Sequence, residues 1–380
     1  MIDKKRKVLI VGGGIGGLSA AVSMRRSNIE CEIVEVNPDW TVYGVGIIQP
    51  NNVLRALDKL GLAQECVDRG GGFPGWRIYD AQGGFLMDAP SASTAAPRYP
   101  PVNGITRPIL QSILGASAKA HGCPIRLGVT IDNLQDSGSD VHVEFTDGSE
   151  GTYDFVIGAD GAYSKVRERL FGGQLRPQFT GQGAWRYNLP RPTSVEWGEI
   201  YFGRSTKVGL VPLSKTLMYL FAVTAEASNP KMPMEQLDEI MRDRISEFTG
   251  PVAHLRSQIT DPRAVVYKPM ESMILPAPWF KGRTLLLGDA AHATTPHLAQ
   301  GAAMAVEDSV LLGEILRRET SIPAVFDEFM SRRFKRCQYV VETSRQIGDW
   351  EMESWRGIQS PNADPGGLLH QAQLALLDDF

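Results

Sequence analysis

The amino-acid sequence predicts an α/β fold in which a Rossmann-type, dinucleotide-binding domain carries an inserted, mostly antiparallel β-sheet and ends in long helices. The apolar run at 8–11 leads into a glycine-rich turn and then into a helix-forming segment at 18–26. Residues 179–270 contain short stretches in which apolar and polar side chains alternate, which is typical of antiparallel strands. Residues 302–318 and 322–345 have the composition of long helices.

The remaining elements follow in chain order. Gly61 is expected to end a helix at 51–60, and Asp147-Gly148 is expected to form the turn of a hairpin. The expected elements are a strand at 31–36, helices at 51–60 and 107–119, a hairpin with strands at 141–145 and 153–157, and a buried strand at 283–287. In the inserted sheet we expect strands at 184–189, 199–202, 208–213 and 217–223, with 76–80 and 85–88 as candidates for two more.

These elements divide the chain into two predicted domains. The first consists of the dinucleotide-binding segments and the C-terminal helices, at residues 1–72, 98–178 and 271–380. The second is a substrate-binding β-sheet domain at residues 73–97 and 179–270. A chain of 380 residues, 43% of them hydrophobic, is long enough for two cores. The proline-containing stretch at 91–101 is expected to be a mobile loop.

The composition narrows the possible functions. The net charge is -4, from 39 basic and 43 acidic residues, which argues against a nucleic-acid partner or an anionic membrane surface. No uninterrupted apolar run approaches the ~20 residues that a membrane span needs. The four cysteines stand far apart and form no C-x-x-C pair, so neither a zinc site nor a disulfide framework is expected. We therefore expect a cytoplasmic protein, either a monomer or a homodimer.

The first motif is Gly12-x-Gly14-x-x-Gly17, which follows a predicted strand and opens a helix. The first glycine makes the turn, the second lets the backbone approach a pyrophosphate, and the third allows close packing of the helix. Free N–H groups at the helix start then bind the phosphates. Glu35 stands 18 residues after Gly17, where its carboxylate can accept hydrogen bonds from a ribose. The motif predicts dinucleotide binding but does not separate NAD from FAD.

Two further motifs follow in the order that a single FAD-binding domain requires. The first is Gly158-Ala159-Asp160-Gly161, followed by Ser164 and Arg167. The second runs from Gly288-Asp289 to Gln300-Gly301-Ala302. Together with the glycine motif, they resemble the signatures of the class A FAD-dependent aromatic monooxygenases, and the hydroxylases of salicylate, 6-hydroxynicotinate and urate are the nearest types. The resemblance covers nearly the whole chain and implies a fold like that of p-hydroxybenzoate hydroxylase.

The resemblance also implies how FAD is bound. Asp289 would contact the ribityl or pyrophosphate part of FAD, and the N–H groups of Gly301 and Ala302 would face the N1–C2=O edge of the flavin. A helix start at that edge stabilises negative charge on reduced flavin by roughly 0.3–1 kcal/mol or more. The motif around Asp160 would serve FAD contact, or closure of the fold and docking of the nicotinamide nucleotide. The predicted cofactor-binding residues are Gly12, Gly14, Gly16, Gly17, Glu35, Val36, Gly46, Ile47, Arg107, Val129, Asp160, Asp289, Gly301 and Ala302.

The substrate side is predicted from the same resemblance. Arg186, Lys207 and Tyr219 fall on sheet positions that face the flavin, and a guanidinium at 186 could pair with a carboxylate or phenolate. The alternatives are an exposed arginine and a half-buried packing tyrosine. Lys207 replaces the arginine used by the urate hydroxylases, which argues against urate as the substrate. His297 directly follows a proline expected beside the flavin, and it is a candidate to steer or deprotonate a substrate hydroxyl.

No metal site is predicted. The spacing of His292 and His297 suits none, and no nearby carboxylate or cysteine is expected to complete one. We expect His292 instead to hold its loop through a ring N–H.

The resemblance implies a single-component monooxygenase that uses NADH or NADPH as a transient co-substrate. In the family mechanism, the nicotinamide reduces FAD, O₂ adds to form a flavin C4a-hydroperoxide, and an electron-rich ring attacks its distal oxygen. The expected substrate is a small phenolic or hydroxylated N-heteroaromatic compound. Two alternatives stay open: a FAD-dependent oxidase or dehydrogenase on the same fold that inserts no oxygen, and a flavin-binding protein that senses an aromatic ligand without turnover.

Overall fold

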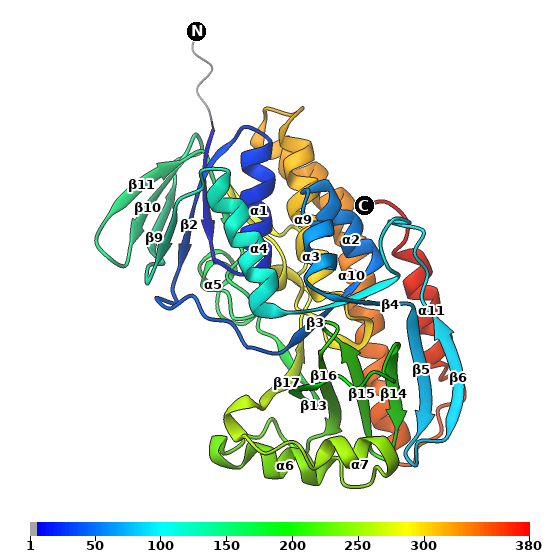
Figure 1. The fold of residues 1–380 in the computed structure, drawn as a ribbon. Coiled ribbons are helices and arrows are strands. Elements are labelled where there is room, and N and C mark those ends of the chain that lie inside the picture. Colours follow the sequence, from blue (N-terminus) through cyan, green and yellow to red (C-terminus); the bar gives the residue numbers. More distant parts are fainter. Residues whose placement is uncertain (1–5) are drawn as a thin grey trace.

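The computed structural model describes residues 6–380, which form two packed units (Figure 1). The first unit is built on a six-stranded sheet with the order β18-β19-β12-β1-β2-β8. Its strands are β1 (Lys7–Val11), β2 (Glu30–Glu35), β8 (Ile125–Leu127), β12 (Phe155–Gly158), β18 (Phe280–Lys281) and β19 (Thr284–Leu286). All neighbours run parallel except the β18-β19 pair at the edge. This is the predicted Rossmann-type domain.

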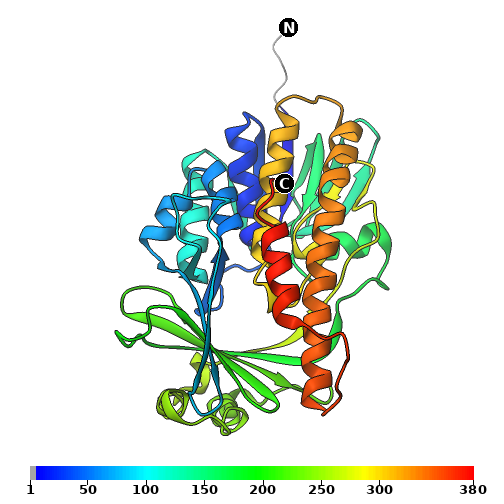
Figure 2. The same cartoon turned by 90° about the vertical axis from the view of Figure 1, so that its right-hand side faces the viewer.

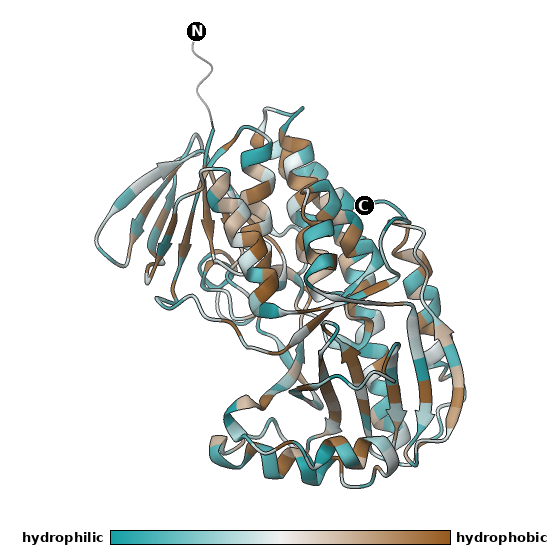
Figure 3. Cartoon of the chain, in the orientation of Figure 1, coloured by the Kyte–Doolittle hydropathy of each residue, from teal (hydrophilic) through white to brown (hydrophobic). Residues whose placement is uncertain are grey.

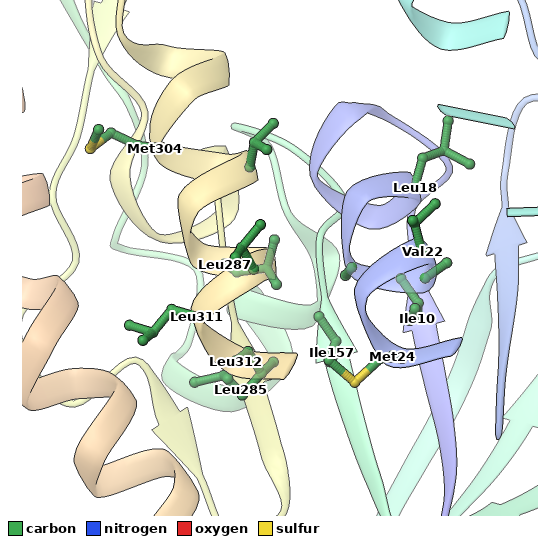
Figure 4. Close-up of a cluster of buried hydrophobic side chains, with 14 of the residues drawn as sticks. Ile10, Leu18, Val22, Met24, Ile157, Leu285, Leu287, Met304, Leu311 and Leu312 are labelled. Atoms are coloured by element: carbon green, nitrogen blue, oxygen red, sulfur yellow. The ribbon is translucent and has the colours of Figure 1, made fainter. Parts of the chain in front are cut away.

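Helices cover this parallel sheet because its strands are apolar on both faces. The helices of the first unit are α1 (Ile15–Arg26), α2 (Asn51–Lys59), α3 (Ala63–Asp68), α4 (Arg107–Ala120), α5 (Lys165–Phe171), α8 (Asp289–His292) and α9 (Gly301–Leu316). α1 packs against α4 and α9. Leu18 and Val22 of α1 share one buried apolar cluster with Leu311 of α9 and with Ile10 and Leu285 of the strands (Figure 4).

A separate antiparallel sheet of β9 (Ile131–Asp136), β10 (Val141–Phe145) and β11 (Glu150–Tyr153) flanks the parallel sheet. The sequence predicted a single returning strand at 153–157, and that prediction was wrong. Asp154 separates β11 from β12, because its N–H donates to the Lys7 carbonyl (2.8 Å) and its carboxylate accepts from the Lys7 N–H (2.7 Å). The chain thereby passes from one sheet into the other.

The second unit is a seven-stranded sheet with the order β17-β13-β16-β15-β14-β5-β6. Its strands are β5 (Gly75–Asp80), β6 (Phe85–Pro90), β13 (Gln178–Pro190), β14 (Gly198–Phe202), β15 (Thr206–Pro212), β16 (Leu217–Ala225) and β17 (Val266–Ser272). All neighbours are antiparallel except β14 and β5. The inserted sheet is therefore mostly antiparallel, as predicted, whereas the residue boundaries of the two domains stay a prediction.

One face of this sheet is covered by helices, and the other is turned to the first unit. The covering helices are α6 (Leu237–Arg244) and α7 (Gly250–Arg256), with the short turns η1 (Met234–Gln236) and η2 (Pro262–Ala264) beside them. Trp185, Tyr187 and Leu189 alternate along β13 into the core under these helices, which also contains Met241 and Phe248. The side chains between them on β13 therefore point toward the first unit. Hydrophobic residues run along the strands of both units (Figure 3).

A small sheet of β3 (Gly46–Pro50), β7 (Val102–Thr106) and β4 (Gly71–Phe73) joins the two units. Val102 packs with Val211 and Tyr219 of the large sheet. Gly46 allows the two sheets to approach closely, because a Cβ at that position would lie 2.3 Å from the Tyr219 ring. The joint therefore brings β3 against the strand that carries Tyr219.

The C-terminal helices α10 (Ile322–Trp355) and α11 (Pro365–Ala375) run along both units (Figure 2). α10 has 34 residues, about 51 Å at 1.5 Å per residue, and it contacts α9 at one end and β13 at the other. The sequence predicted that this helix ends at residue 345, and that prediction was wrong. The helix continues through Gly348, where a Cβ would lie 2.8 Å from a ring atom of His297, so close packing overrides the low helix propensity of glycine. Among residues 6–380, no helix combines the length and apolarity needed to cross a bilayer.

The stretch at 91–101, expected to be mobile, is bonded to α2. Asn51 Nδ2 donates to the carbonyls of Ala96 and Pro100 (both 3.1 Å), and Asn51 Oδ1 accepts from the Ala96 N–H (2.7 Å). The Tyr99 hydroxyl donates to Asp58 (2.7 Å). These bonds anchor the segment at its centre and at its C-terminal end.

Candidate functional site

The glycine turn after β1 leaves the first N–H groups of α1 open. Gly12 has φ = +110°, and a Cβ there would lie 2.3 Å from the carbonyl oxygen of Ala159. A Cβ on Gly17 would lie 1.9 Å from the Gly12 carbonyl oxygen, so both positions need glycine. Gly14 is the N-cap of α1, and no atom lies within 4 Å of its Cβ position; Gly16 lies in the first turn. An anion can therefore approach the positive end of α1.

Glu35 closes this turn from the end of β2. Its Oε2 accepts from the Gly13 N–H (2.7 Å), and its Oε1 accepts from the Asn37 N–H (2.8 Å). Each carboxylate oxygen can accept a second hydrogen bond, so ribose hydroxyls can still bind there. The Val129 N–H donates to the Glu35 carbonyl (3.1 Å), and the Val36 side chain is exposed beside it. Glu35, Val36 and Val129 thus lie together at the adenosine end of the predicted FAD site.

The second motif connects β12 to α5 and is held by its own side chains. Asp160 accepts from the Ser164 hydroxyl (2.5 Å) and from two backbone N–H groups at the start of α5 (2.7 and 3.1 Å), so it caps that helix. Arg167 donates to the carbonyl of Ala290 (2.9 Å), which belongs to the third motif. The structure thus uses both side chains to close the fold, and contact of Asp160 with FAD stays a prediction.

The third motif begins where β19 ends. Gly288 has φ = +60°, and its N–H donates to Asp308 (3.0 Å), so the chain turns sharply and Asp289 becomes the first residue of α8. The Asp289 side chain is exposed, yet desolvation by the surrounding protein raises its pKa, which the nearby Arg107 partly opposes. The Asp289 side chain is therefore accessible to solvent and yet surrounded by protein atoms, as is a side chain that lines a recess. Within residues 6–380, no protein group donates a hydrogen bond to this carboxylate, which leaves it available to FAD hydroxyls.

The start of α9 is fixed by an amide pair. Gln300 precedes the helix, and its amide exchanges two hydrogen bonds with Asn52 of α2 (2.9 and 3.0 Å). The helix has no side-chain cap, so the N–H groups of Gly301 and Ala302 have no acceptor within the helix. These are the groups predicted to face the flavin, and their orientation is set by Asn52.

Arg107 follows the last strand of the small joining sheet and lies on the side of the first unit where α8 and α9 begin. Its N–H donates to the carbonyl of Val45 (3.1 Å), directly before Gly46 and Ile47 of β3. The Thr106 hydroxyl caps α4, so Arg107 is the first residue of that helix. β3 also contacts α9. The predicted residues of β3, α4, α8 and α9 therefore converge on one region.

A buried ionic cluster lies beneath the start of α9. Arg333 of α10 donates to Asp308 (2.7 Å) and Glu307 (2.9 Å), and Nε2 of His292 lies 2.7 Å from the other oxygen of Asp308. Burial opposes ionisation, but His292 and Arg333 hold the pKa of Asp308 at about 2. The cluster ties α8 and α9 to α10, and His292 holds its loop as expected.

His292, Asp308 and Cys337 also offer three potential metal ligands whose atoms lie within 4.8 Å of one another. The expectation that no carboxylate or cysteine lies near His292 was therefore wrong, because packing of α10 on α9 brings distant residues together. Arg333, however, lies 2.7 Å from Asp308 and 3.5 Å from the Cys337 sulfur. Its positive charge repels a cation at this position, so we assign no metal to the cluster.

The sheet face turned to the first unit carries three rows of side chains. Their members are Ala184, Val223 and Lys207; Arg186, Phe221 and Gly209; and Asn188, Tyr219 and Val211. Gly209 makes room for the Phe221 ring, because a Cβ there would lie 2.1 Å from it. The rings of Phe221 and Tyr219 have centroids 6.0 Å apart. Arg186 therefore stands beside two aromatic rings.

Within residues 6–380, neither Arg186 nor Arg107 has a salt bridge or a hydrogen bond from its guanidinium to protein. Asp289 lies near enough to Arg107 to act on its charge, whereas no carboxylate acts on Arg186. Burial, followed by the charge of Arg107, lowers the pKa of Arg186 to about 10. Burial raises the pKa of the Tyr219 hydroxyl to about 12. At neutral pH the two arginines are therefore charged and Tyr219 is protonated. A buried arginine with a second arginine nearby and no carboxylate partner of its own within residues 6–380 favours an anionic ligand.

Lys207 and His297 are both engaged by Glu351 of α10. The Lys207 ammonium pairs with Oε1 of Glu351, and Nε2 of His297 lies 3.2 Å from Oε2. Nδ1 of His297 lies 2.9 Å from the Thr295 hydroxyl, so both ring nitrogens have protein partners. Burial, with Lys207 adding to it, lowers the pKa of His297. The structure brings these two predicted residues together, and their contact with substrate stays a prediction.

Comparisons with known proteins agree with this geometry. The family model described as "FAD binding domain" matches residues 5–344. The chain is 31% identical over 344 residues to YetM of Bacillus subtilis (strain 168), which bears the name of a FAD-dependent monooxygenase. The matched region covers 90% of this chain and 93% of that protein. The chain is 30% identical over 349 residues to the aurachin C monooxygenase/isomerase of Stigmatella aurantiaca, with 90% of each covered. The structure of Klebsiella pneumoniae HpxO with FAD and uric acid superposes with a TM-score of 0.84 at 23% identity, over 98% of this chain and 97% of that one.

The protein is thus a flavoprotein enzyme of the aromatic hydroxylase type. It belongs to the FAD-binding-domain family, among the class A FAD-dependent monooxygenases, and the predicted family and fold class are confirmed. The open N–H groups of α1 and α9 and the unpartnered Asp289 fit FAD.

Two side chains that contact predicted site residues were not found by the sequence analysis. Phe221 is separated from Tyr219 by one residue, so their shared face follows from strand periodicity and could have been found. Glu351 lies beyond the predicted end of α10, and no local pattern signals that it meets β15 and η3 (Pro296–Leu298).

Proposed function

We propose that the enzyme uses NADH or NADPH and O₂ to hydroxylate a small aromatic compound that carries an ionisable group, such as a phenolic or hydroxylated N-heteroaromatic ring. The observation that carries this proposal is the buried guanidinium of Arg186, which has no carboxylate partner within residues 6–380 and lies near Arg107, Phe221 and Tyr219. The HpxO structure that this fold resembles contains uric acid, an oxygenated N-heteroaromatic compound, which supports the proposed class.

Bound FAD would supply the redox chemistry that takes electrons from the nicotinamide and activates O₂. Gly14 and Gly301, at two helix starts, would hold its phosphates and the flavin edge, and Asp289 would accept from its hydroxyls. The protein thus fixes the cofactor mainly with backbone groups of the first unit.

The residues of the sheet act on the substrate. Arg186 would pair with an anionic substrate oxygen and so favour the phenolate form, which is the more reactive one toward an electrophilic oxygen donor. Tyr219, protonated at neutral pH, can donate a hydrogen bond to the same oxygen. Phe221 offers a ring against which an aromatic substrate can pack.

The proposal is tested by NADH and NADPH oxidation in air, across matched pairs of phenols and hydroxylated N-heteroaromatics that differ only by O-methylation. We expect the ionisable member of a pair to accelerate oxidation, and its methyl ether to leave the rate at the basal value. Equal acceleration by both members would remove the role of the two arginines.

Arg186→Met should raise the KM of the stimulating substrate about 10- to 100-fold, because a hydrogen bond to a charged group contributes about 1.5–3 kcal/mol. FAD content and the melting temperature should stay unchanged, since Arg186 has no hydrogen-bonded partner within residues 6–380. Arg204→Met is the matched control, because that side chain is 93% exposed on the same sheet unit. A KM that responds equally to both substitutions would contradict the assignment.

His297→Gln should lower the rate of hydroxylation more than the rate of FAD reduction by NAD(P)H. The ring contacts Thr295 and Glu351, and Nδ1 of its neutral form can accept a proton through the Thr295 hydroxyl that donates to it. Stopped-flow absorbance separates the two half-reactions. If both rates fall by the same factor, or neither falls, His297 has no special part in oxygen transfer.

A further inference from the structure

Glu351 makes contacts to three segments that lie far apart in the sequence. It stands near the end of α10, where the helix runs beside the large sheet (Figure 2). One carboxylate oxygen pairs with Lys207 of β15. The other accepts from Gln182 Nε2 of β13 (3.1 Å) and lies 3.2 Å from His297 Nε2 of η3. A single side chain therefore connects a C-terminal helix, two strands of the substrate sheet and the segment before α9.

The group is nearly closed to solvent. The side chains of Glu351, Lys207 and His297 are 11%, 13% and 1% exposed. Burial acts against ionisation of Glu351, but Lys207 and His297 hold its pKa at about 2. An ionised carboxylate can only accept hydrogen bonds, so His297 donates from Nε2, and Nδ1 of the neutral ring accepts from the Thr295 hydroxyl. Glu351 thereby fixes one tautomer of the ring.

The backbone of α10 is adapted to this contact. A Cβ on Gly348 would lie 2.8 Å from His297 and 2.9 Å from Gln182, so only glycine lets the helix approach closely enough. This close approach places the carboxylate of Glu351, three residues later, over Lys207 and His297. Because η3 leads directly to Gln300 and the start of α9, a fixed η3 also fixes the flavin-facing edge of the site.

The pairing of Glu351 with Lys207 also determines which positively charged side chain is available to bind a substrate. Lys207 lies one row from Arg186 on the same face of the sheet. Its charge is neutralised by Glu351, whereas Arg186 has no protein anion within residues 6–380. The geometry thus separates a lysine that binds protein from an arginine that is free for a ligand.

We propose that Glu351 is a positioning residue: its carboxylate holds Lys207 and His297 as one unit and fixes η3 against the substrate sheet. This inference rests on the proposed hydroxylation, since the unit forms a wall of the proposed substrate site. Glu351 acts through its neighbours and does not itself touch the reacting atoms.

The first test is the titration of His297 by NMR of its ring protons in the FAD-loaded protein. The chain has six histidines, so His297→Gln identifies the signal. Lys207 of β15, and Glu351 and Asp349 of α10, are the charged groups that act on this ring, and the one titratable residue of α11, His370, is exposed. We expect Glu351→Gln to lower the pKa of His297 and Lys207→Met to raise it, because the two charges act in opposite directions. Glu342→Gln, an exposed position on α10, should leave it unchanged.

The second test is turnover. Glu351→Gln should lower hydroxylation about tenfold, as misplacement of groups at a site does, while FAD reduction by NAD(P)H stays within about twofold. Lys207→Met combined with Glu351→Gln should be less impaired than Glu351→Gln alone, because the double variant buries no unpaired charge. That double variant also keeps the test decisive if Glu351→Gln fails to fold.

The outcomes separate this inference from the proposed function. If His297 titrates alike in the wild type and in Glu351→Gln, or if the double variant is merely the sum of the single ones, the positioning role is overturned. If no aromatic compound gains oxygen with the wild type, the proposed function fails, while the NMR titration still decides whether Glu351 holds the ring.

Discussion

Asp289→Ala is expected to purify with little FAD while remaining folded. The carboxylate has no hydrogen-bond donor within residues 6–380, so its removal breaks no protein hydrogen bond there. It is predicted to accept hydrogen bonds from FAD, and a hydrogen bond to a charged group contributes about 1.5–3 kcal/mol, which corresponds to a 10- to 150-fold weaker Kd. The ratio of absorbance at 450 nm to that at 280 nm measures FAD content, and a melting curve of the apoprotein measures folding.

A conservative variant and a control test the interpretation of this result. Asp289→Asn should retain more FAD than Asp289→Ala, because an amide oxygen can still accept a hydrogen bond. Asp261→Ala removes an exposed carboxylate from the sheet unit and should leave FAD content unchanged. Fully yellow Asp289→Ala protein would remove this residue from the cofactor site.

Arg333→Met is expected to destabilise the protein by up to about 3–5 kcal/mol, because it removes the guanidinium that two fully buried carboxylates share. Among residues 6–380, Glu307 then keeps only Arg336 as a salt-bridge partner, and Asp308 keeps only His292. Denaturation by urea at pH 7, with excess FAD, measures the difference in free energy of unfolding. Asp308 has a folded pKa of about 2, below its ordinary 3.8, so its contribution to stability is present above about pH 4 and is lost as the pH falls to about 2. The difference between wild type and variant should therefore narrow over that range.

Lys335→Met is the control, since Lys335 is an exposed cation on the same helix, two residues after Arg333. Its loss should change the free energy of unfolding by only about 0.5 kcal/mol. An Arg333→Met variant as stable as this control would show that the buried cluster does not hold α8 and α9 to α10.

The cofactor side of the molecule was predictable because its signals are local. Gly12 is required by its positive φ and Gly17 by its contact with the Gly12 carbonyl, both within one turn. Glu35 lies at the end of the next strand, so a motif of fixed spacing records the geometry of all three. Asp289 and Gly301 likewise stand at the ends of a strand and a loop within one short segment. Spacing therefore predicted the positions of Gly12, Gly17 and Glu35, and the resemblance of the later motif to a known family predicted those of Asp289 and Gly301.

The substrate side was less predictable because it depends on contacts between distant segments. Lys207 was expected to face the flavin and His297 to act on a substrate hydroxyl. Both are held by Glu351, which lies in a stretch of α10 that the sequence did not predict as helix. The environment of His292 was missed for the same reason, since Cys337 reaches it only through packing of α10. Register and helix packing decide these neighbours, and no spacing in the sequence records them.

The central claim is that the enzyme transfers an oxygen atom from O₂ to an ionisable aromatic ring. The most direct measurement is mass spectrometry of the product formed with NADH or NADPH under ¹⁸O₂, using the compound that most accelerates nicotinamide oxidation. The account predicts a product heavier by one ¹⁸O atom, formed only in the presence of that compound. A product that has lost two hydrogens, or that carries oxygen from water, would contradict it and point to a FAD-dependent oxidase or dehydrogenase on the same fold.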